Sequence, residues 1–489
     1  MLLVLVLDSR IVFNRNNSVI TLIGSTTNWK MKLYSSKYNY SSKINSRYSL
    51  INNTLTGAVD IIENNIWHLV EKSKFELLER YPLSNLIERG YLYDNPDGEK
   101  RLLTKLYKSY MEKATSRPIR FVFCPSYYCN LNCTYCFEKN FPYYNSHQFM
   151  SDVIFTKSID AMEKLAEKYS GRVYSIELFG GEPLLKRTKR MVKKILELAN
   201  FKKTSVTIVT NGVNIEKLID IIYPHKKNIE MIQITVDGPP EIHDRRRKYR
   251  SGRGTFNIIS KGIDLLLKNN ISTNVRINVD NSNIEYLPQV YKYFNHKKWT
   301  SNKKFKIQLS LVIDHTSLDY NETITPSEVL LQKLIRIYNS YPELEEVFGF
   351  HIFKPLRHLL DIIRGAPNIS PKFINCETNL LELHIFCPDG LIYTCPESIG
   401  YPEFAIGKFY PDLEYFEDKV KLWKERTIFN IPECRECKFS PICGGGCSYS
   451  SLSIYKGDKI PVCERYQEVL DTFLRLRGEK ILKKYMNDS

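Results

Sequence analysis

Two hydrophobic periodicities alternate along the middle of the chain. Short apolar runs rich in β-branched and aromatic residues are separated by stretches with the spacing of amphipathic helices. Strands that alternate with helices indicate βα units and a parallel sheet. Six units predict a partial (β/α)6 barrel, in which chemistry gathers at the carboxyl ends of the strands. The predicted strands are 121–124, 173–179, 205–210, 231–236, 272–279 and 305–313, and the helices between them include 156–168, 184–199, 256–268 and 284–295.

A different pattern precedes the barrel. Two short extended runs predict a hairpin over 47–62, and helical spacing predicts helices at about 62–72, 75–80 and 99–114. A hairpin with helices makes a small α+β domain, which we assign to residues 31–115. The domain is complete before the first cysteine and contains no catalytic constellation, so its expected role is packing or binding.

The first 30 residues receive no fold. The apolar run at 1–10 lacks both the basic region and the small-residue cleavage site of a signal peptide. Met31 is an alternative start, which would make residues 1–30 an upstream extension. We therefore leave 1–30 out of the predicted domains.

Composition excludes several classes of protein. Of the 489 residues, 43% are apolar and 25% charged, which excludes a disordered chain and a fibrous rod. No run approaches the ~18 apolar residues of a membrane span, so no membrane partner is expected. The net charge of +16 admits an acidic or nucleic-acid partner. Because the basic residues are dispersed, we do not expect nucleic acid.

The 12 cysteines change this picture because they are clustered. Four lie between 124 and 136, three between 376 and 395, and five between 434 and 463, with none over 137–375. A secreted protein with disulfides would spread its cysteines along the chain. Tight clusters with short fixed gaps indicate metal ligation in a reducing compartment, and we expect the cytoplasm.

Unusual residues follow each of the first four predicted strands. The carboxyl ends of parallel strands meet at one edge, so these segments should share one rim. Glycines there allow a ligand to approach the backbone, and Glu182 and Asp237 offer acceptors for an amine or for ribose hydroxyls. The segments are Cys129-Asn-Leu-Asn-Cys133-Thr-Tyr-Cys136, Phe179-Gly180-Gly181-Glu182-Pro183, Thr210-Asn211-Gly212 and Asp237-Gly238-Pro239.

The first of these segments has CxxxCxxC spacing, which allows two kinds of site. A four-cysteine zinc site needs another ligand, for which Cys124 is a candidate. Cys124 lies inside a strand run, however, and is better explained as a small core residue. Three thiolates can instead hold a [4Fe–4S] cluster and leave one iron open for a substrate or cofactor.

CxxxCxxC with Tyr135 before the last cysteine, together with the GGEP sequence at 180–183, resembles the radical S-adenosylmethionine (SAM) enzymes. The resemblance implies that Cys129, Cys133 and Cys136 hold a [4Fe–4S] cluster whose open iron binds the amino and carboxylate groups of SAM. It also implies reductive cleavage of SAM to a 5′-deoxyadenosyl radical, which abstracts a substrate hydrogen. An electron donor such as flavodoxin or ferredoxin is then needed.

The same resemblance suggests which residues contact SAM. The GGEP segment would bind the methionine amino group, and the backbone at Tyr135 would lie near adenine. Arg247 follows two other arginines, and such a run is more often a solvated surface. The contacts implied in full are Tyr135, Gly180, Gly181, Glu182, Thr210, Asn211, Thr235, Asp237 and Arg247.

The C-terminal cysteines form the patterns CX13GX4C, CX2CX5CX3C and a final Cys463. Read alone, the four middle cysteines could be a zinc ribbon. The whole order resembles the SPASM extension of radical SAM enzymes, which implies two auxiliary [4Fe–4S] clusters. Cys387 could complete the first cluster, or its open iron could bind a substrate thiolate. The implied ligands are Cys376, Cys395 and Cys447 for the first cluster, and Cys434, Cys437, Cys443 and Cys463 for the second.

The leading hypothesis is an enzyme that matures a ribosomally made precursor peptide. The predicted division is a radical SAM core over 116–340 and a SPASM domain with a C-terminal helix over 341–489. The SPASM pattern is common among peptide modifiers, and the domain at 31–115 resembles leader-recognition modules, in which a peptide adds a strand to a sheet edge. The expected product is a thioether or carbon–carbon crosslink.

Two alternatives remain open. The segment DGPPEIHD at 237–244 resembles the anaerobic sulfatase maturases, which make formylglycine. That family has an aspartate base directly after the cysteine matching Cys395, where this chain has Pro396, and we expect Glu397 to point elsewhere. The third hypothesis is a zinc-stabilised nucleic-acid-binding protein, supported by the charge and the CX2CX5CX3C pattern, but it leaves GGEP unexplained.

Overall fold

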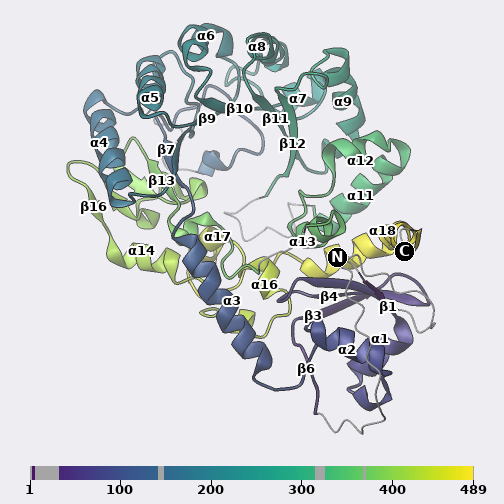
Figure 1. Cartoon of the computed structure of the whole chain (residues 1–489). Coiled ribbons are helices and arrows are strands. Elements are labelled where there is room, and N and C mark those ends of the chain that lie inside the picture. The colour runs from purple at the N-terminus through teal and green to yellow at the C-terminus, as the bar shows by residue number, and fades with distance from the viewer. Residues whose placement is uncertain (1–2, 6–31, 141–147, 314–324, 367–370, 488–489) are drawn as a thin grey trace.

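The computed structural model describes residues 3–5, 32–140, 148–313, 325–366 and 371–487. Figure 1 shows an arc of strands and outer helices, with the N-terminal domain below it and the C-terminal helix α18 between the two. In the described part of the chain, no helix is long and apolar enough to cross a membrane.

A ten-stranded sheet forms the centre, in the order β12-β11-β10-β9-β8-β7-β13-β14-β15-β16. Strands β7 to β12 are all parallel, which confirms the predicted parallel barrel sheet. Their alternate side chains fill the core, where Ile208, Ile234 and Ile277 are fully buried. The strands are β7 (Ile119–Phe123), β8 (Tyr174–Leu178), β9 (Val206–Thr210), β10 (Ile229–Thr235), β11 (Thr273–Val279) and β12 (Phe305–Leu311).

Helices cover the outer face of this sheet (Figure 1). The predicted helix at 156–168 begins earlier, because Ser151 caps it by accepting a hydrogen bond from the Ile154 backbone N–H at 3.2 Å. The predicted helix at 184–199 begins later, because Thr188 holds 184–188 in a buried turn. The helices are α4 (Asp152–Lys168), α5 (Lys189–Lys202), α6 (Ile215–Ile222), α7 (Pro240–Arg246), α8 (Phe256–Lys268) and α9 (Leu287–His296).

The sheet continues beyond the six predicted strands. Strand β13 (Leu383–Phe386) pairs in parallel with β7, and Phe386 stands opposite Phe123. β13 then forms an antiparallel hairpin with β14 (Leu391–Tyr393) around a turn at Pro388-Asp389-Gly390. The first C-terminal cysteines are thereby built onto the edge of the barrel beside the CxxxCxxC loop.

The N-terminal domain contains a four-stranded sheet in the order β1-β5-β4-β3. The predicted hairpin is present, but the third strand, β3, was not predicted because its sequence NYSSK has no apolar alternation. The piece predicted at 75–80 is a short 3-10 turn at Phe75–Leu77, and a further helix, α2, follows it. The elements are β1 (Leu3–Leu5), β3 (Asn39–Lys43), β4 (Tyr48–Asn53), β5 (Ala58–Glu63), α1 (Asn64–Glu71) and α2 (Arg80–Glu88), with a small sheet of β2 (Tyr34–Ser35) and β6 (Leu92–Tyr93).

Two helices join this domain to the rest of the chain. The apolar face of α3 (Gly98–Ala114) packs against a cluster around Phe373 and Ile431 in the cysteine-rich region. Helix α18 (Tyr466–Asn487) lies against β3, where the Tyr40 hydroxyl donates to Asp471 at 2.7 Å. The last helix therefore docks on the N-terminal domain.

The C-terminal region is built mainly from helices and two very short strands. A run of glycines with positive φ, Gly444-Gly445-Gly446, turns the chain sharply between two of these helices. Its elements are α11 (Ser327–Ser340), α12 (Glu343–Phe348), α13 (Lys354–Ile363), β15 (Gly407–Lys408), β16 (Glu414–Tyr415), α14 (Glu417–Lys424), α15 (Pro432–Arg435), α16 (Ser440–Cys443) and α17 (Ser448–Ser453).

Candidate active site

A cavity of about 300 Å³ lies at the carboxyl ends of the parallel strands. Residues from all six parallel strands or the loops after them reach it, as expected for a barrel rim. The structure therefore brings together most of the residues singled out from the sequence. The predicted residues that line the cavity are Cys129, Cys133, Cys136, Tyr135, Gly180, Gly181, Glu182, Thr210, Asn211, Thr235 and Arg247.

The three-cysteine loop is fixed by the segment that follows α7. The backbone N–H of Thr134 donates to the Arg246 carbonyl at 2.9 Å, and that of Asn132 donates to the Lys248 carbonyl at 2.8 Å. Burial raises the pKa of all three thiols, Cys129, Cys133 and Cys136. Neutral thiols are thus favoured until a cation or a metal centre binds them, because a buried thiolate without one is costly.

The turn at Gly180-Gly181 needs glycine at both positions. Both residues have positive φ, +87° and +39°. A β-carbon on Gly181 would lie 2.5 Å from the Tyr128 carbonyl oxygen, and one on Gly180 would lie 2.3 Å from the Cys124 sulfur. The two glycines therefore let the turn press against the loop that carries the cysteines.

Glu182 is almost completely buried and ties two loops together. Its carboxylate accepts hydrogen bonds from the Thr210 hydroxyl at 2.5 Å, the Asn211 backbone N–H at 2.7 Å and the Leu184 backbone N–H at 2.8 Å. Burial raises the pKa of Glu182, and these hydrogen bonds oppose the shift. The carboxylate thus already has three protein donors and also lies on the cavity wall, where it offers negative charge to a ligand.

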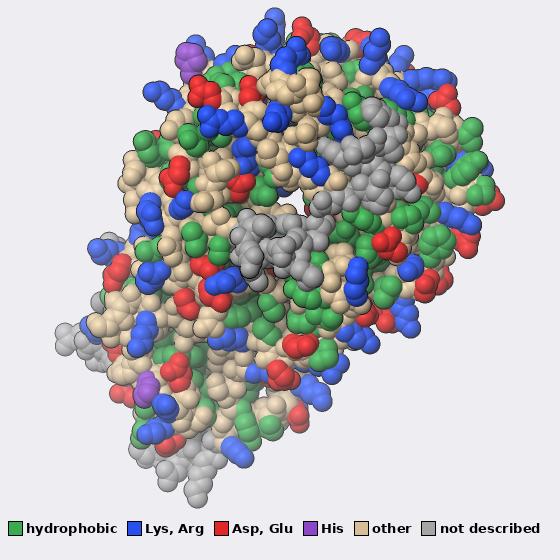
Figure 2. Space-filling view, turned by 180° about the vertical axis from the view of Figure 1, so that it is seen from behind, with side chains coloured by type: hydrophobic (Ala, Val, Ile, Leu, Met, Phe, Trp, Pro, Cys, Tyr) green, Lys and Arg blue, Asp and Glu red, His purple; other side chains and the backbone are tan. Residues whose placement is uncertain are grey.

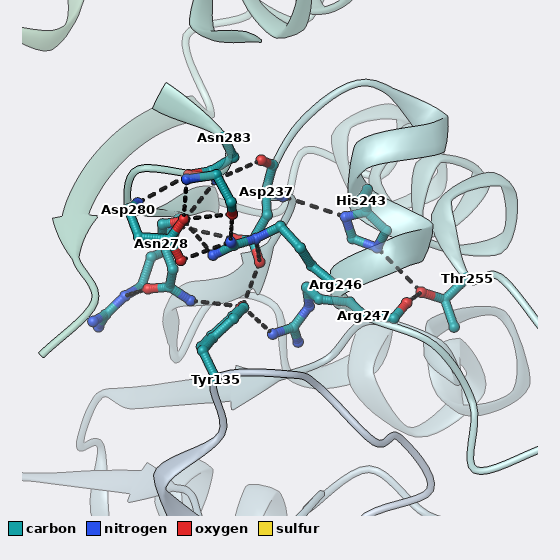
Figure 3. A network of polar contacts seen from close by, with 11 residues as sticks. Tyr135, Asp237, His243, Arg246, Arg247, Thr255, Asn278, Asp280 and Asn283 are labelled. Atoms are coloured by element: carbon teal, nitrogen blue, oxygen red, sulfur yellow. Dashed lines mark hydrogen bonds and ion pairs between the residues drawn. The ribbon is translucent and has the colours of Figure 1, made fainter. Parts of the chain in front are cut away.

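Tyr135 is the centre of a buried polar network (Figure 3). Its hydroxyl donates to Asp237 and accepts from Arg247 Nη1 at 2.7 Å and Asn278 Nδ2 at 3.0 Å. The Arg246 guanidinium lies 4.7 Å from the centre of the Tyr135 ring. The network fixes the ring beside the cysteines and orients Arg247 toward the cavity.

Two expectations about this network change with the structure. Arg247 is only 8% exposed, so the solvated-surface interpretation of the arginine run is wrong for Arg247 and holds only for its exposed neighbour Arg245. Asp237 does not line the cavity. It lies behind Tyr135, where it accepts from the Tyr135 hydroxyl and from the Asn278 backbone N–H at 2.9 Å, so it helps to position Tyr135.

Replacing Tyr135 with Phe removes one hydroxyl that three polar groups share. We expect the free energy of unfolding to fall by about 1–3 kcal/mol, because Asp237 and Arg247 stay buried but lose a partner. Urea unfolding of the variant measures the loss. Tyr341→Phe is the control, since Tyr341 is 46% exposed and should change stability by less than about 0.5 kcal/mol. Equal effects of the two changes would contradict the role of the network.

Several cavity residues were not found from the sequence. Glu138 is buried two residues after the last cysteine of the motif, its carboxylate accepts from the Gly181 N–H at 3.0 Å, and burial raises its pKa to about 8. Arg276 and Asn278 alternate along β11 and face the cavity, which the period of two on that strand could have indicated. The expectation for Glu397 was wrong, because the short turn after Cys395 brings Glu397 into the cavity wall.

The remaining cysteines form two groups of neighbours. Burial raises the pKa of Cys434 to about 12, with further contributions from the thiols of Cys443, Cys437 and Cys463. Burial also raises the pKa of Cys395, to which the nearby Cys447 and Cys376 contribute. The two groups contain the cysteines that the sequence pattern assigned to two ligand sets, from segments up to 71 residues apart in the chain, and their role as ligands stays a prediction.

Cys387 stands apart from both groups. It is fully buried in a cluster with Cys124 and Tyr127, and Cys124 is its hydrogen-bonding neighbour. The strand pairing explains this, because Cys124 and Cys387 each follow directly after the paired residues of β7 and β13. The two cysteines left unassigned by the sequence patterns are therefore partners of each other in the core.

The surroundings of the two groups suit anionic metal centres. Lys354 is half-buried near Cys447 and Cys443 and pairs with Glu464 at 2.5 Å. A cluster held by thiolates carries net negative charge, which a buried cation stabilises. Within the described residues, no three His, Cys, Asp or Glu side chains converge closely enough to hold a single metal ion.

The chain is similar to known proteins both in sequence and in fold. The radical SAM superfamily model matches residues 123–294, from the end of β7 into α9. A cysteine-type anaerobic sulfatase-maturating enzyme of Clostridium perfringens (strain ATCC 13124) is 26% identical over 353 residues, which cover 65% of this chain and 85% of that enzyme. The antilisterial bacteriocin subtilosin biosynthesis protein AlbA of Bacillus subtilis is 23% identical over 358 residues, covering 71% and 70% of the two chains.

Among solved structures, the fold is similar to SuiB of Streptococcus suis. The SuiB structure bound to S-adenosylmethionine has a TM-score of 0.51 and 16% identity, and the match covers 88% of this chain and 99% of SuiB. SuiB bound to its precursor peptide SuiA has a TM-score of 0.50 and 17% identity, with 88% and 98% covered. At this identity the match is evidence for the fold alone. The shared fold includes most of the chain outside the barrel.

Proposed function

From the premise that the chain carries a radical SAM domain and is an enzyme homologous to sulfatase maturases and AlbA, we propose that it modifies a ribosomally made precursor peptide. The modification is a thioether or carbon–carbon crosslink. The observation that carries this proposal is the N-terminal domain, which lies outside the barrel and contains a small four-stranded sheet to which a peptide would add a strand. The SAM and [4Fe–4S] cofactors are those of the superfamily.

The residues around the cavity fit these cofactors. Three thiols on one loop leave room for a fourth, non-protein ligand, and Gly180-Gly181 lets that ligand approach the backbone. When bound, SAM and the cluster supply a 5′-deoxyadenosyl radical after one-electron reduction. Cys129, Cys133 and Cys136 would hold the cluster, Glu182 would accept a hydrogen bond from the amino group of SAM, and Arg247 would lie near its carboxylate or ribose.

The outer side of β5 supports a peptide partner. Strand β1, only three residues long, covers this side by pairing in parallel with β5 over Leu3–Leu5 and Asp60–Ile62, so β5 pairs there with a strand from a distant segment. At the other side of the sheet, β3 lies against α18. A leader peptide that adds a strand would gain main-chain hydrogen bonds at the β5 side. Its binding there would compete with β1.

The charge distribution is compatible with a peptide rather than with nucleic acid. Figure 2 shows Lys and Arg side chains spread over one face and interspersed with Asp and Glu. A stripe of basic residues is expected for a surface that follows a phosphate backbone. We propose that the enzyme works in the cytoplasm and receives electrons from a flavodoxin or ferredoxin, since cytoplasmic reductants keep cysteines reduced.

A second candidate function, formylglycine formation, gains support from Glu397. This carboxylate lies in the cavity wall next to Cys395, although the chain has Pro396 where the maturases have an aspartate. The chain is also 26% identical to a cysteine-type sulfatase-maturating enzyme. The two functions differ in substrate, because a sulfatase peptide needs no leader.

One experiment separates these proposals. The protein is purified and reconstituted anaerobically, reduced with dithionite and given SAM with either a leader-bearing precursor peptide or a short cysteine-containing sulfatase peptide. Crosslinking is expected to release 5′-deoxyadenosine and to make the precursor lighter by two hydrogens in mass spectrometry. We expect about twelve irons per chain for three clusters, and little zinc. A zinc protein without iron would end the enzyme proposal, and aldehyde formation on the sulfatase peptide alone would favour the second candidate.

A further inference from the structure

Arg426 is a buried arginine in the middle of the cysteine-rich region. Arg426 follows two residues after the end of α14, and it is only 2% exposed. Three of its N–H groups donate to neutral oxygens: Nη1 to the Ser451 hydroxyl at 2.9 Å and to the Asp458 carbonyl at 2.6 Å, and Nη2 to the Gly445 carbonyl at 2.8 Å. The guanidinium therefore has a fixed position but no carboxylate hydrogen-bonded to it among the described residues.

The Nε–H of Arg426 is the unusual group. It is buried and has no acceptor within the described residues. A buried donor without an acceptor costs about 1–3 kcal/mol, so folded proteins rarely keep one. The Asp458 carboxylate interacts electrostatically with Arg426, but the guanidinium bonds only the backbone carbonyl of that residue. Some acceptor with negative charge is expected beside this nitrogen when the protein is loaded.

The cysteines that interact electrostatically with Arg426 indicate what this acceptor is. Cys434, Cys447 and Cys443 are the cysteines whose thiolates would interact with Arg426. Cys434 and Cys443 belong to one cysteine group, whereas Cys447 belongs to the other. Arg426 is therefore a neighbour of cysteines from both groups.

The glycine run makes this placement possible. Gly445 has φ +88°, and a β-carbon on it would lie 4.0 Å from the Cys434 sulfur. The same residue turns its carbonyl to Arg426 Nη2. The turn between Cys443 and Cys447 therefore holds both the sulfur atoms and the guanidinium, and a movement of one would move the other.

We propose that Arg426 is a positioning residue that lies between the two auxiliary iron–sulfur clusters and donates its Nε–H to a cluster or cysteine sulfur. This inference rests on the proposed function, because it requires the auxiliary clusters. A reduced cluster carries one more negative charge than the oxidised one. A nearby cation that also donates a hydrogen bond to sulfur stabilises the reduced form and raises the reduction potential.

Redox titration tests the proposal in a variant that lacks only the cluster held by the CxxxCxxC loop, made by changing Cys129, Cys133 and Cys136 to Ala. The auxiliary clusters are then reduced at set potentials and counted by electron paramagnetic resonance. Arg426→Gln should lower the ratio of reduced to oxidised cluster at least about tenfold at a fixed potential, which is 59 mV for one electron. Arg426→Lys keeps the charge and should shift it less. Arg477→Gln is the control, since Arg477 is also buried but pairs with Glu345 at 3.2 Å.

A second measurement needs no variant to fold. In protein labelled with ¹⁵N-arginine, the reduced auxiliary clusters should show a nitrogen coupling and an exchangeable proton coupling in electron–nuclear resonance spectra. If these couplings are absent, or if Arg426→Gln keeps its iron and its potentials, the inference is overturned. Absence of auxiliary iron from the unchanged chain would instead overturn the proposed function.

Discussion

Changing Cys129, Cys133 and Cys136 together to Ala is expected to abolish the reductive cleavage of SAM. The three thiols lie on one loop, buried beside the cavity, and the structure places no other cysteine on that cavity's wall among the described residues. About four of some twelve irons should be lost, because each [4Fe–4S] site binds independently. Iron analysis and chromatography of 5′-deoxyadenosine after dithionite reduction give the two readouts.

Cys124→Ala is the matched control for this prediction. Cys124 lies only five residues before Cys129, but its sulfur is buried in the core against Gly180 and beside Cys387. Its loss should cost about 1 kcal/mol of stability from the small cavity left behind, with SAM cleavage retained. Continued formation of 5′-deoxyadenosine by the triple variant would show that the radical chemistry uses another site.

Much of the barrel could be predicted because its strands bury alternate side chains in the core, as in β9 and β11. Their apolar residues therefore recur with a period close to two, which differs from the helical spacing between them. Their carboxyl ends then placed the cysteine, glycine and Thr210 segments on one rim without knowledge of the tertiary structure. Sequence reasoning succeeded where local pattern and topology determine position.

It failed where position depends on contacts between distant segments. Strand β13 adds to β7 from more than 250 residues away, and that pairing turns Glu397 into the cavity. Asp237 follows a strand like the other rim residues, but Arg246 and Asn278 draw it behind Tyr135. The pairing of Cys124 with Cys387 also follows only from the sheet order, since neither cysteine belongs to a spaced motif.

The grouping of the C-terminal cysteines could be predicted from the sequence only in part. Their spacing, together with a family resemblance, implied two ligand sets, and in the structure Cys395 interacts with Cys447 and Cys376, and Cys434 with Cys443, Cys437 and Cys463. The spacing could not indicate Arg426 or Lys354, because neither has a fixed offset from any cysteine. Residues that tune a site through charge are set by the tertiary structure and leave no periodic signal.

Gly181→Ala is expected to damage the site severely, because the methyl group has no space. Gly181 has φ +39°, which costs an alanine about 1–2 kcal/mol. The added carbon would also lie 2.5 Å from the Tyr128 carbonyl oxygen and 2.7 Å from that of Ser126, both of which are backbone atoms and cannot rotate away. Overpacking of this kind costs about 1–3 kcal/mol more. The turn must then separate from the cysteine loop, and Glu138 loses the Gly181 N–H.

Gly171→Ala distinguishes backbone strain from this steric effect. Gly171 also has positive φ, +89°, but no atom lies within 4 Å of the position of its β-carbon. It should therefore lose about 1–2 kcal/mol of stability and keep its affinity for SAM. In equilibrium dialysis, the affinity of Gly181→Ala for SAM should fall roughly tenfold or more, since each 1.4 kcal/mol of binding free energy is a factor of ten in affinity. Equal SAM affinities for the two variants would mean that close contact between the glycine turn and the cysteine loop does not shape the binding site.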